Sequence, residues 1–454
     1  MFKTLKNAWR IPELKKKLLF TLLIIVLYRL GANIPVPYVD PDVFAQATDL
    51  FSGSIFQFLN LLSGEALAKA TLLALGVSPY ITASIVVQLL TIALPPLEKW
   101  AKEGDDGKKK LTMLTRIITV ALALVTSIGY AFFLNANGML VDIVNTTTGK
   151  TGPTFFHYMV IVASYCAGAS LVMWLAEKIN EHGIGNGISI ILFANIIAGL
   201  FSMFTAIGGL VVQNGVFVWW GLVLAILEVL VLLAMVMLIV WMSDAERRIP
   251  IQYAKRVVGR KMYGGQNTHL PLKVNMAGVM PIIFANSIVA IPATIAMFIT
   301  NQQNWFVKFV NNWFNYNTWP YFVVFLVLLI AFAFFYVAIS FNPVEVANNI
   351  KNNGGAIPGI RVGKPTVDFI KKVLSRITLV GAILVAIIAC FPMLVNNVEF
   401  TVKSIIYKDQ AFGSWFSAFA FGGSSMMIMV GVALETFREL EAQMSLRNYK
   451  GFLD

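Results

Sequence analysis

The chain has 454 residues, of which 58% are hydrophobic and only 13% are charged. Soluble domains carry roughly a quarter of their residues as charges, so this composition excludes an ordinary soluble protein and indicates an all-α, polytopic membrane protein. The net charge is +12. We expect this excess to collect on the cytoplasmic side, because membrane proteins concentrate Lys and Arg there.

The first seventeen residues contain six basic residues and one acid, so the segment 1–17 is expected in the cytoplasm. A retained span is predicted over residues 18–34, with Arg29 near its far end reaching towards the outer interface. Residues 31–60 contain no Lys or Arg, which marks an external segment.

The stretch from Asn60 to Leu90 is apolar, but Gly76 and Pro79 interrupt it. Its front half carries residues that are too polar for a comfortable span: Ser63, Gly64, Glu65 and Lys69. The pattern predicts two short pieces, and such interrupted segments at membrane depth are typical of transport proteins. The alternative is one Pro-kinked span that follows an ordinary external loop.

The second half of this stretch is the second predicted span, and eight more follow along the chain. They are expected at residues 111–135, 155–176, 186–210, 216–242, 275–300, 320–341, 374–394 and 422–437. Ten spans place both termini in the cytoplasm, including the tail 441–454. Two pseudo-symmetric inverted halves, 18–212 and 213–440, are compatible with this count, although the halves show no obvious sequence similarity.

Two predicted cytoplasmic loops are long and basic. Residues 243–273 carry seven basic residues against two acids, and residues 342–376 carry six against two. These loops either enforce topology and touch anionic lipid, or they dock an acidic partner such as ribosomal RNA or an ATPase.

No pattern of a catalytic, metal or nucleotide site is present in the sequence. Cys166 and Cys390 lie in apolar runs, and the three histidines lack metal-binding spacing. The loop GGAIPGIRVGKP resembles a phosphate loop, but Pro358 replaces its first glycine and Pro365 replaces the magnesium-binding Ser or Thr. We therefore expect no cofactor, no metal and no enzymatic activity.

Ile81, Ile85 and Gln88 share one face of the second span, either as ordinary packing or as part of a constriction. Ser84 lies four residues before Gln88, and both would need a polar partner in a membrane, such as Asn286. A secondary carrier is the competing class, but carriers need ion-coupling carboxylates at the midplane. Near the middle of a predicted span only Glu228 offers one.

Several motifs carry a family resemblance: LGANIPVP, SGEALAKATLLALGVSPYITASIVVQLL, INEHGIGNGISI, RRIPIQYAKR, THLPLKVNMAGVMPIIFANSI and NPVEVANNIKNNGGAIPGIRVGKPT. Together they make the chain resemble the SecY family, the channel subunit of the bacterial Sec translocon, over residues from about 10 to 440. The resemblance implies an hourglass channel in the plasma membrane. Such a channel conducts unfolded secretory polypeptides passively and releases hydrophobic segments sideways into lipid.

The resemblance also implies roles for individual residues. A plug over about 61–70 would block the external funnel, and it includes Leu61, Leu62, Ser63, Gly64, Glu65, Ala66 and Leu67. An apolar pore ring would contain Ile81, Ile85, Ile191 or Ile190, Ile283, and Met427 or Ile428. A lateral gate would open between spans two and three and spans seven and eight, with Ser84, Gln88 and Asn286 as polar contacts.

Partners follow from the same resemblance. The basic loops would dock the ribosome or the SecA ATPase through Arg247, Arg248, Lys255, Arg256, Arg361 and Lys364. SecE and SecG are the implied membrane companions, and signal peptides and nascent polypeptides are the implied cargo.

Overall fold

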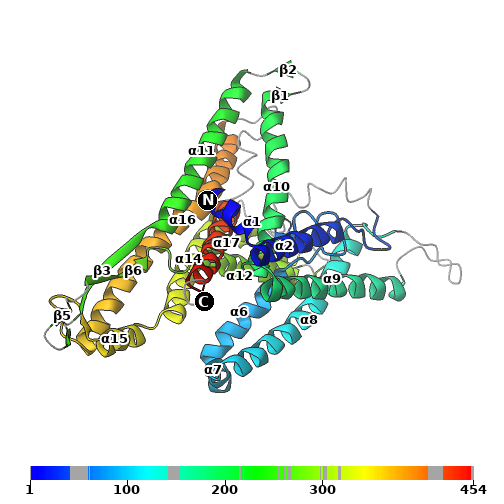
Figure 1. Cartoon of the computed structure of the whole chain (residues 1–454). Coiled ribbons are helices and arrows are strands. Elements are labelled where there is room, and N and C mark those ends of the chain that lie inside the picture. Colours follow the sequence, from blue (N-terminus) through cyan, green and yellow to red (C-terminus); the bar gives the residue numbers. More distant parts are fainter. Residues whose placement is uncertain are drawn as a thin grey trace.

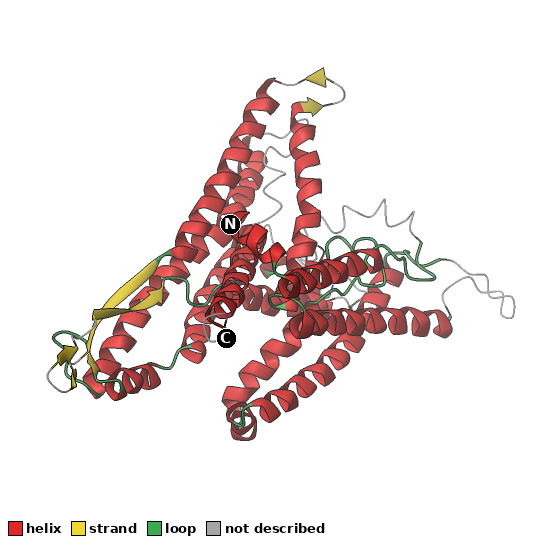
Figure 2. Cartoon of the chain, in the orientation of Figure 1, coloured by secondary structure: helices red, strands yellow, loops and turns green. Residues whose placement is uncertain are grey.

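The computed structural model is dominated by helices (Figure 1, Figure 2). It describes residues 2–40, 60, 62–141, 154–213, 216–217, 219–253, 256–258, 261–263, 267–296, 298–299, 304–314, 318–406 and 423–450. Helices of the N-terminal part are α1 (Phe2–Arg10), α2 (Pro12–Gly31), α6 (Ser78–Ala93), α7 (Pro95–Lys102), α8 (Asp105–Ala136), α9 (Phe155–His182) and α10 (Gly187–Val211). Those of the C-terminal part are α11 (Trp219–Asp244), α12 (Met280–Ala296), α13 (Trp305–Trp313), α14 (Trp319–Ser340), α15 (Pro343–Asn352), α16 (Lys364–Ile406) and α17 (Gly423–Lys450).

A helix overlaps each of the ten predicted spans, but not all ten are long and apolar enough to cross a membrane. Six described helices meet that condition, or seven if the bent pair α6 and α7 is one span. Outside this set are α2, which has charges at both ends, α12, which has 17 residues, and α17, whose second half is charged. The chain is a multi-pass membrane protein, and the count of ten stays a prediction.

Several helix boundaries differ from the predicted ones. The residues between the second and third predicted spans contain α7 and the start of α8. Leu94 is extended (φ −112°, ψ 114°) because proline follows it, and the chain turns by 102° between α6 and α7. Asp105 and Asp106 then begin α8, where carboxylates favour the positive end of the helix dipole. Likewise, the residues between the predicted spans 275–300 and 320–341 contain the helix α13.

The interrupted stretch does not form one Pro-kinked span, so that alternative is wrong. Residues 64–70 and 72–77 are turns, and α6 begins only at Ser78. The turns are attached to the chain that follows α2: Leu72 N donates to Ile34 O at 2.8 Å, and Val36 N donates to Ala70 O at 3.3 Å. We call residues 60–77 the re-entrant segment.

The all-α prediction holds for the membrane part but not for the two basic loops. There β3 (Glu246–Tyr253) pairs antiparallel with β6 (Asn267–Lys273) and with β7 (Gly355–Ala356), in the order β6-β3-β7. Two further short pairs form separate sheets: β4 (Arg256–Val258) with β5 (Lys261–Tyr263) in the first basic loop, and β1 (Val212–Gln213) with β2 (Val216–Phe217) between α10 and α11. The period-two alternation of Ile249 and Ile251 predicts a strand, a signal that the count of charges obscured.

The two loops predicted as separate thus form one folded unit, the basic protrusion (residues 246–273 and 342–370). Its apolar core contains Ile249, Ile251, Leu272, Ala347, Ile350, Ile357 and Ile370. In Figure 1 the protrusion lies at one end of the molecule, with β5 near its tip.

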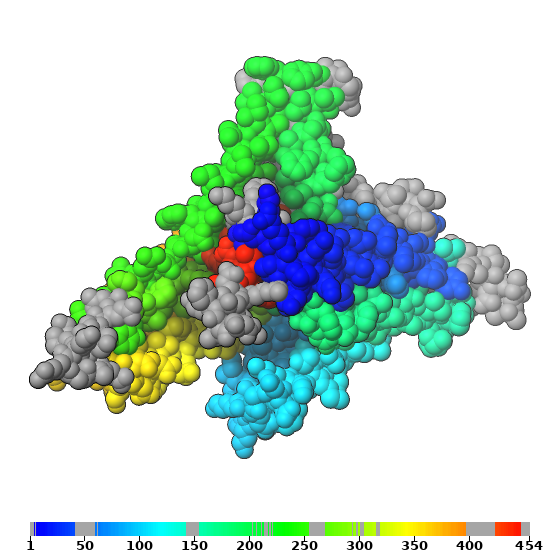
Figure 3. Space-filling view, in the orientation of Figure 1, coloured from blue at the N-terminus to red at the C-terminus, as the bar shows by residue number. Residues whose placement is uncertain are grey.

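Both ends of the described chain lie together. Thr4 Oγ1 of α1 donates to Glu441 at 3.2 Å, and Lys17 Nζ donates to Gln443 at 3.3 Å. The space-filling view shows the N-terminal residues (dark blue) lying beside α17 (red) (Figure 3). The face shared by α1, α2 and α17 therefore joins the first and last parts of the sequence.

Candidate functional site

The five predicted ring residues come from four helices and are all buried. Ile81 and Ile85 lie on α6, Ile191 on α10, Ile283 on α12 and Met427 on α17, and none is more than 8% exposed. They belong to one apolar cluster, the waist, which also includes their alternatives Ile190 and Ile428. Because both residues of each alternative pair are buried in the same cluster, burial does not choose between them.

The re-entrant segment packs directly on the waist. Leu62 and Ala66, which are 6% and 1% exposed, belong to the same apolar cluster as Ile81 and Ile85. Leu67 and Ala70 face the other way and join a second cluster with Tyr130 of α8 and Tyr165 of α9. Of the predicted plug residues, Leu61 lies outside the described residues.

The turns of the re-entrant segment depend on its own polar side chains. Ser63 Oγ donates to Asn60 O at 2.8 Å and accepts from Leu67 N at 3.0 Å. Asn60 Oδ1 accepts from Ala68 N at 2.9 Å. These bonds satisfy backbone groups that no helix or sheet satisfies, which is the condition for irregular backbone at membrane depth.

Surrounding helices hold the segment by its backbone carbonyls. The hydroxyl of Tyr130 donates to Leu67 O at 2.5 Å, and that of Tyr165 donates to Ala70 O at 3.4 Å. Asn195 of α10 donates to Leu62 O at 2.6 Å and to the Tyr28 hydroxyl at 2.9 Å.

Arg29 does not reach towards the outer interface, so that prediction is wrong. Its guanidinium turns inwards and donates to Ala194 O at 2.6 Å, to Asn195 O at 3.3 Å and to Gly64 O at 3.5 Å. Carbonyl oxygens inside the bundle can take the place of water around a charge, which makes the inward orientation favourable.

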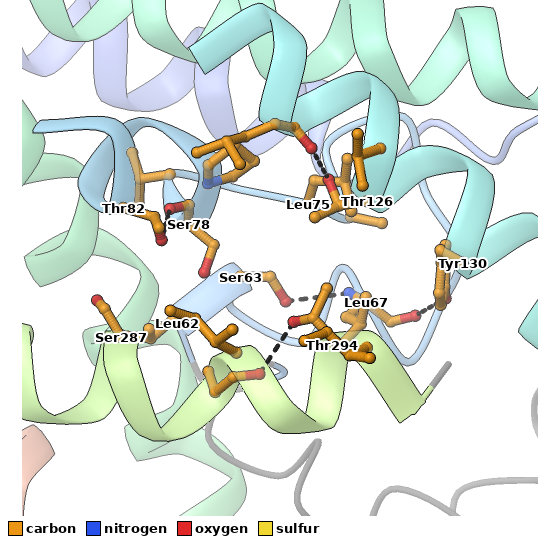
Figure 4. Close-up of a pocket in the computed structure, with 18 of the residues that line it drawn as sticks. Leu62, Ser63, Leu67, Leu75, Ser78, Thr82, Thr126, Tyr130, Ser287 and Thr294 are labelled. Carbon is orange, nitrogen blue, oxygen red and sulfur yellow. Dashed lines mark hydrogen bonds between the residues drawn. The ribbon is translucent and has the colours of Figure 1, made fainter. Parts of the chain in front are cut away.

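A cavity of about 210 Å³ lies between α6, α8, α12 and the re-entrant segment (Figure 4). Its wall is mainly apolar, with hydroxyls from Ser63, Ser78, Thr82, Thr126, Ser287 and Thr294. Asn286 also lines it; this side chain is 2% exposed, and neither of its amide atoms has a hydrogen-bond partner among the described residues. The re-entrant segment, α6 and α8 thus enclose one partly polar space together with α12, which lies far from them in the sequence.

Of the three residues predicted as polar contacts of the gate, only Asn286 lines the cavity. Asn286 faces the cavity together with Ser78 and Thr82 of α6. Ser84 and Gln88 do not line the cavity: Ser84 is half-buried and Gln88 is exposed. Their role as contacts across a gate stays a prediction.

On the basic protrusion, Arg247, Arg248, Arg361 and Lys364 are all exposed. Arg248 pairs with Glu246 at 2.6 Å, whereas Arg361 lies in the turn before α16 and its carbonyl accepts from Thr366 Oγ1 at 2.9 Å. Of the other two predicted docking residues, Lys255 lies outside the described residues, and Arg256 lies on β4 with no described side chain.

Comparison with known proteins assigns the family. The family model described as SecY matches residues 71–437. The protein translocase subunit SecY of Streptomyces coelicolor is 43% identical over 457 residues, which cover 100% of both chains. That of Mycobacterium tuberculosis is 40% identical over 462 residues, covering 98% of both. The chain belongs to the SecY family. The resemblance in its motifs is thereby confirmed over nearly the whole sequence.

Solved structures agree with this SecY fold. A protein-conducting channel superposes with a TM-score of 0.64 at 17% identity, covering 96% of each chain. A structure whose title concerns the plug domain of SecY gives 0.62 at 17% identity, with 96% of each chain covered. The canine Sec61 channel in a ribosome complex gives 0.61 at 15% identity, again over 96% of each chain.

Sequence reasoning on this SecY chain missed the residues that hold the re-entrant segment. Asn195 was detectable as the one amide in the run IILFANIIAGLF, since a polar residue in a span needs a partner. Tyr130 and Tyr165 carry no such signal, because tyrosines in spans are equally common as packing or interface residues. Only the fold shows that their hydroxyls face the same short segment.

Proposed function

We propose that this SecY-family protein is a passive channel through which unfolded secretory polypeptides cross the membrane. The observation that carries the proposal is that the five predicted ring residues, from four helices, are all buried in one apolar cluster, with the re-entrant segment packed against it. Apolar contact is non-directional, so such a ring can close around a passing chain of any sequence. It also resists ions because water leaves an apolar constriction.

Each part of the site has a place in this function. The re-entrant segment is the plug, with Leu62 to Leu67 at its centre, and Ile81, Ile85, Ile191, Ile283 and Met427 form the pore ring. The gap at the cavity between α6 and α8 on one side and α12 on the other is the lateral gate. A segment of about 20 apolar residues leaves through it because lipid solvates that segment better than water does.

The proposed division of the chain follows the same plan: an N-terminal half 18–212 and a C-terminal half 213–440, inverted relative to each other around the pore. It has ten spans in the bacterial plasma membrane and both termini in the cytoplasm. The contact of α6 with α12 supports an opening between the halves, since these helices come from different halves and flank the cavity.

The energy for transport comes from partners. Exposed arginines on the basic protrusion suit an acidic docking surface, and two solved neighbours, canine Sec61 and the yeast Ssh1 complex, are described as ribosome complexes. We propose the ribosome and the SecA ATPase as partners for Arg247, Arg248, Lys255, Arg256, Arg361 and Lys364. SecE and SecG are the proposed membrane companions, and anionic lipid lies beneath the protrusion.

Depletion of the protein in its host tests the proposal. We expect uncleaved secretory precursors to accumulate and growth to stop. The competing secondary carrier predicts saturable uptake of a small solute by the purified protein alone. If export stays normal after depletion and the purified protein takes up a small solute in this way, the channel proposal is wrong and the carrier is favoured.

A further inference from the structure

Two side chains hold the re-entrant segment at the turn where it meets the waist. Asn195 holds Leu62 O at 2.6 Å, and Arg29 reaches Gly64 O at 3.5 Å while it is anchored on Ala194 O at 2.6 Å. Gly64 fits closely between them, since a Cβ on this residue would lie 2.9 Å from both Arg29 Nη1 and Asn195 Oδ1. Both groups donate hydrogen bonds to main-chain oxygens, so these bonds do not depend on the side chains of the segment.

We propose that Arg29 and Asn195 are a latch that keeps the re-entrant segment seated and whose release is coupled to movement of the waist. The proposal rests on the proposed function as a gated channel. The latch spans α2, α10 and the segment, so a displacement of α2 against α10 separates its parts.

The seated conformation of the segment carries two free-energy costs, which other interactions must offset. Glu65 and Ala70 adopt positive φ values of 69° and 43°, a region that costs free energy for residues with a Cβ. Asn195 Oδ1 is buried and has no hydrogen-bond partner in the part of the chain that the structure describes. Both costs disappear once the segment leaves and water reaches the amide, so the bonds of Arg29 and Asn195 must offset them in the closed state.

The position of Asn195 on α10 couples the latch to the ring. It lies four residues after Ile191, so the two side chains share one helix face, about 6 Å apart along the axis. A shift of α10 that widens the waist at Ile191 therefore also moves the amide away from Leu62 O. Opening of the ring and release of the segment become one event.

The first test measures ion leak. Arg29→Gln and Asn195→Ala would each be reconstituted in planar bilayers without cargo, next to two matched controls. Arg116→Gln removes an arginine that joins α8 to α9 through Glu177, and Asn137→Ala removes an amide that donates to Phe133 O at the end of α8. We expect a resting conductance about fivefold to tenfold higher for the two latch variants, no more than for loss of the whole segment, and no change for the controls. Equal conductance in all four overturns the latch.

A second test distinguishes the latch from a general loss of structure. In a background with Cys166→Ala and Cys390→Ala, the pair Gly64→Cys and Asn195→Cys removes the Asn195 half of the latch and puts a disulfide in its place. The oxidised channel is expected to be tight, and the same sample after reduction is expected to leak like Asn195→Ala. Failure of the disulfide to form in resting protein, or a leak that reduction does not change, overturns the proposal.

Failure of the latch and failure of the proposed function are separable. Precursor transport by the unmodified protein in the same vesicles tests the channel alone. A channel that transports precursors while its latch variants stay sealed refutes only the latch.

Discussion

The re-entrant segment and the basic protrusion are stabilised in different ways. The protrusion folds as a small soluble unit, with Ile249, Ile350 and Ile370 inside and its arginines in water. The re-entrant segment is also buried by apolar contact, but its turns depend in addition on Tyr130, Asn195 and Arg29, which donate to its backbone carbonyls. Its seating therefore relies on polar side chains of other helices, and movement of those helices can release it.

The largest effect is expected for the core of the protrusion. Ile350→Ala should destabilise it by about 2–5 kcal/mol, because a buried isoleucine leaves a cavity. Hydrogen exchange of β3 and β6 measures the loss. Val344→Ala on the same helix is the control, since Val344 is 49% exposed. Equal protection in both variants would mean that the protrusion is not held by this core.

A charge in the waist should have the next largest effect. Ile85→Lys places an ammonium group in an apolar cluster at a cost of about 3 kcal/mol, which raises the open population about 100-fold. The readout is resting ion conductance. Ile92→Lys on the same helix is the control, because Ile92 is 52% exposed. The same leak from both would show that Ile85 only packs.

Deletion of residues 61–69 should leave the channel folded but leaky. The expected rise in resting conductance is about tenfold, smaller than for the charged waist, because the apolar ring still resists ions. Planar-bilayer recordings check it. A tight seal in the deleted protein would mean that the re-entrant segment is not a plug.

The smallest effect is expected at the surface of the protrusion. Arg361→Glu should lower motor-dependent precursor translocation about fivefold, since each charge near an anionic surface is worth about 1 kcal/mol. Membrane insertion of the channel itself should be unchanged. Translocation into inverted vesicles is the assay, with Lys108→Glu, at a solvated position in the first turn of α8, as the control. Unchanged translocation by Arg361→Glu removes this residue from the docking surface.

Local sequence patterns predicted much of the helical architecture of the membrane part. Apolar runs located a helix at each of the ten expected places, and Gly76 and Pro79 marked the interruption between the segment and α6. The boundaries were less accurate where charged residues continue a helix beyond the apolar run, as at Asp105 and Lys364. Hydropathy measures transfer into lipid, whereas a helix continues into water as long as its backbone bonds are made.

The sequence by itself determined the family, the membrane class and the approximate position of each apolar helix, because these depend on residues that are close together in the chain. Only the tertiary structure decided that Arg29 turns inwards, that Asn195 reaches Leu62 O, and that two separate loops share one sheet. The physical reason is that a polar group in a membrane bonds whatever partner the fold brings within reach. For these residues the partner is more than 100 positions away in the chain.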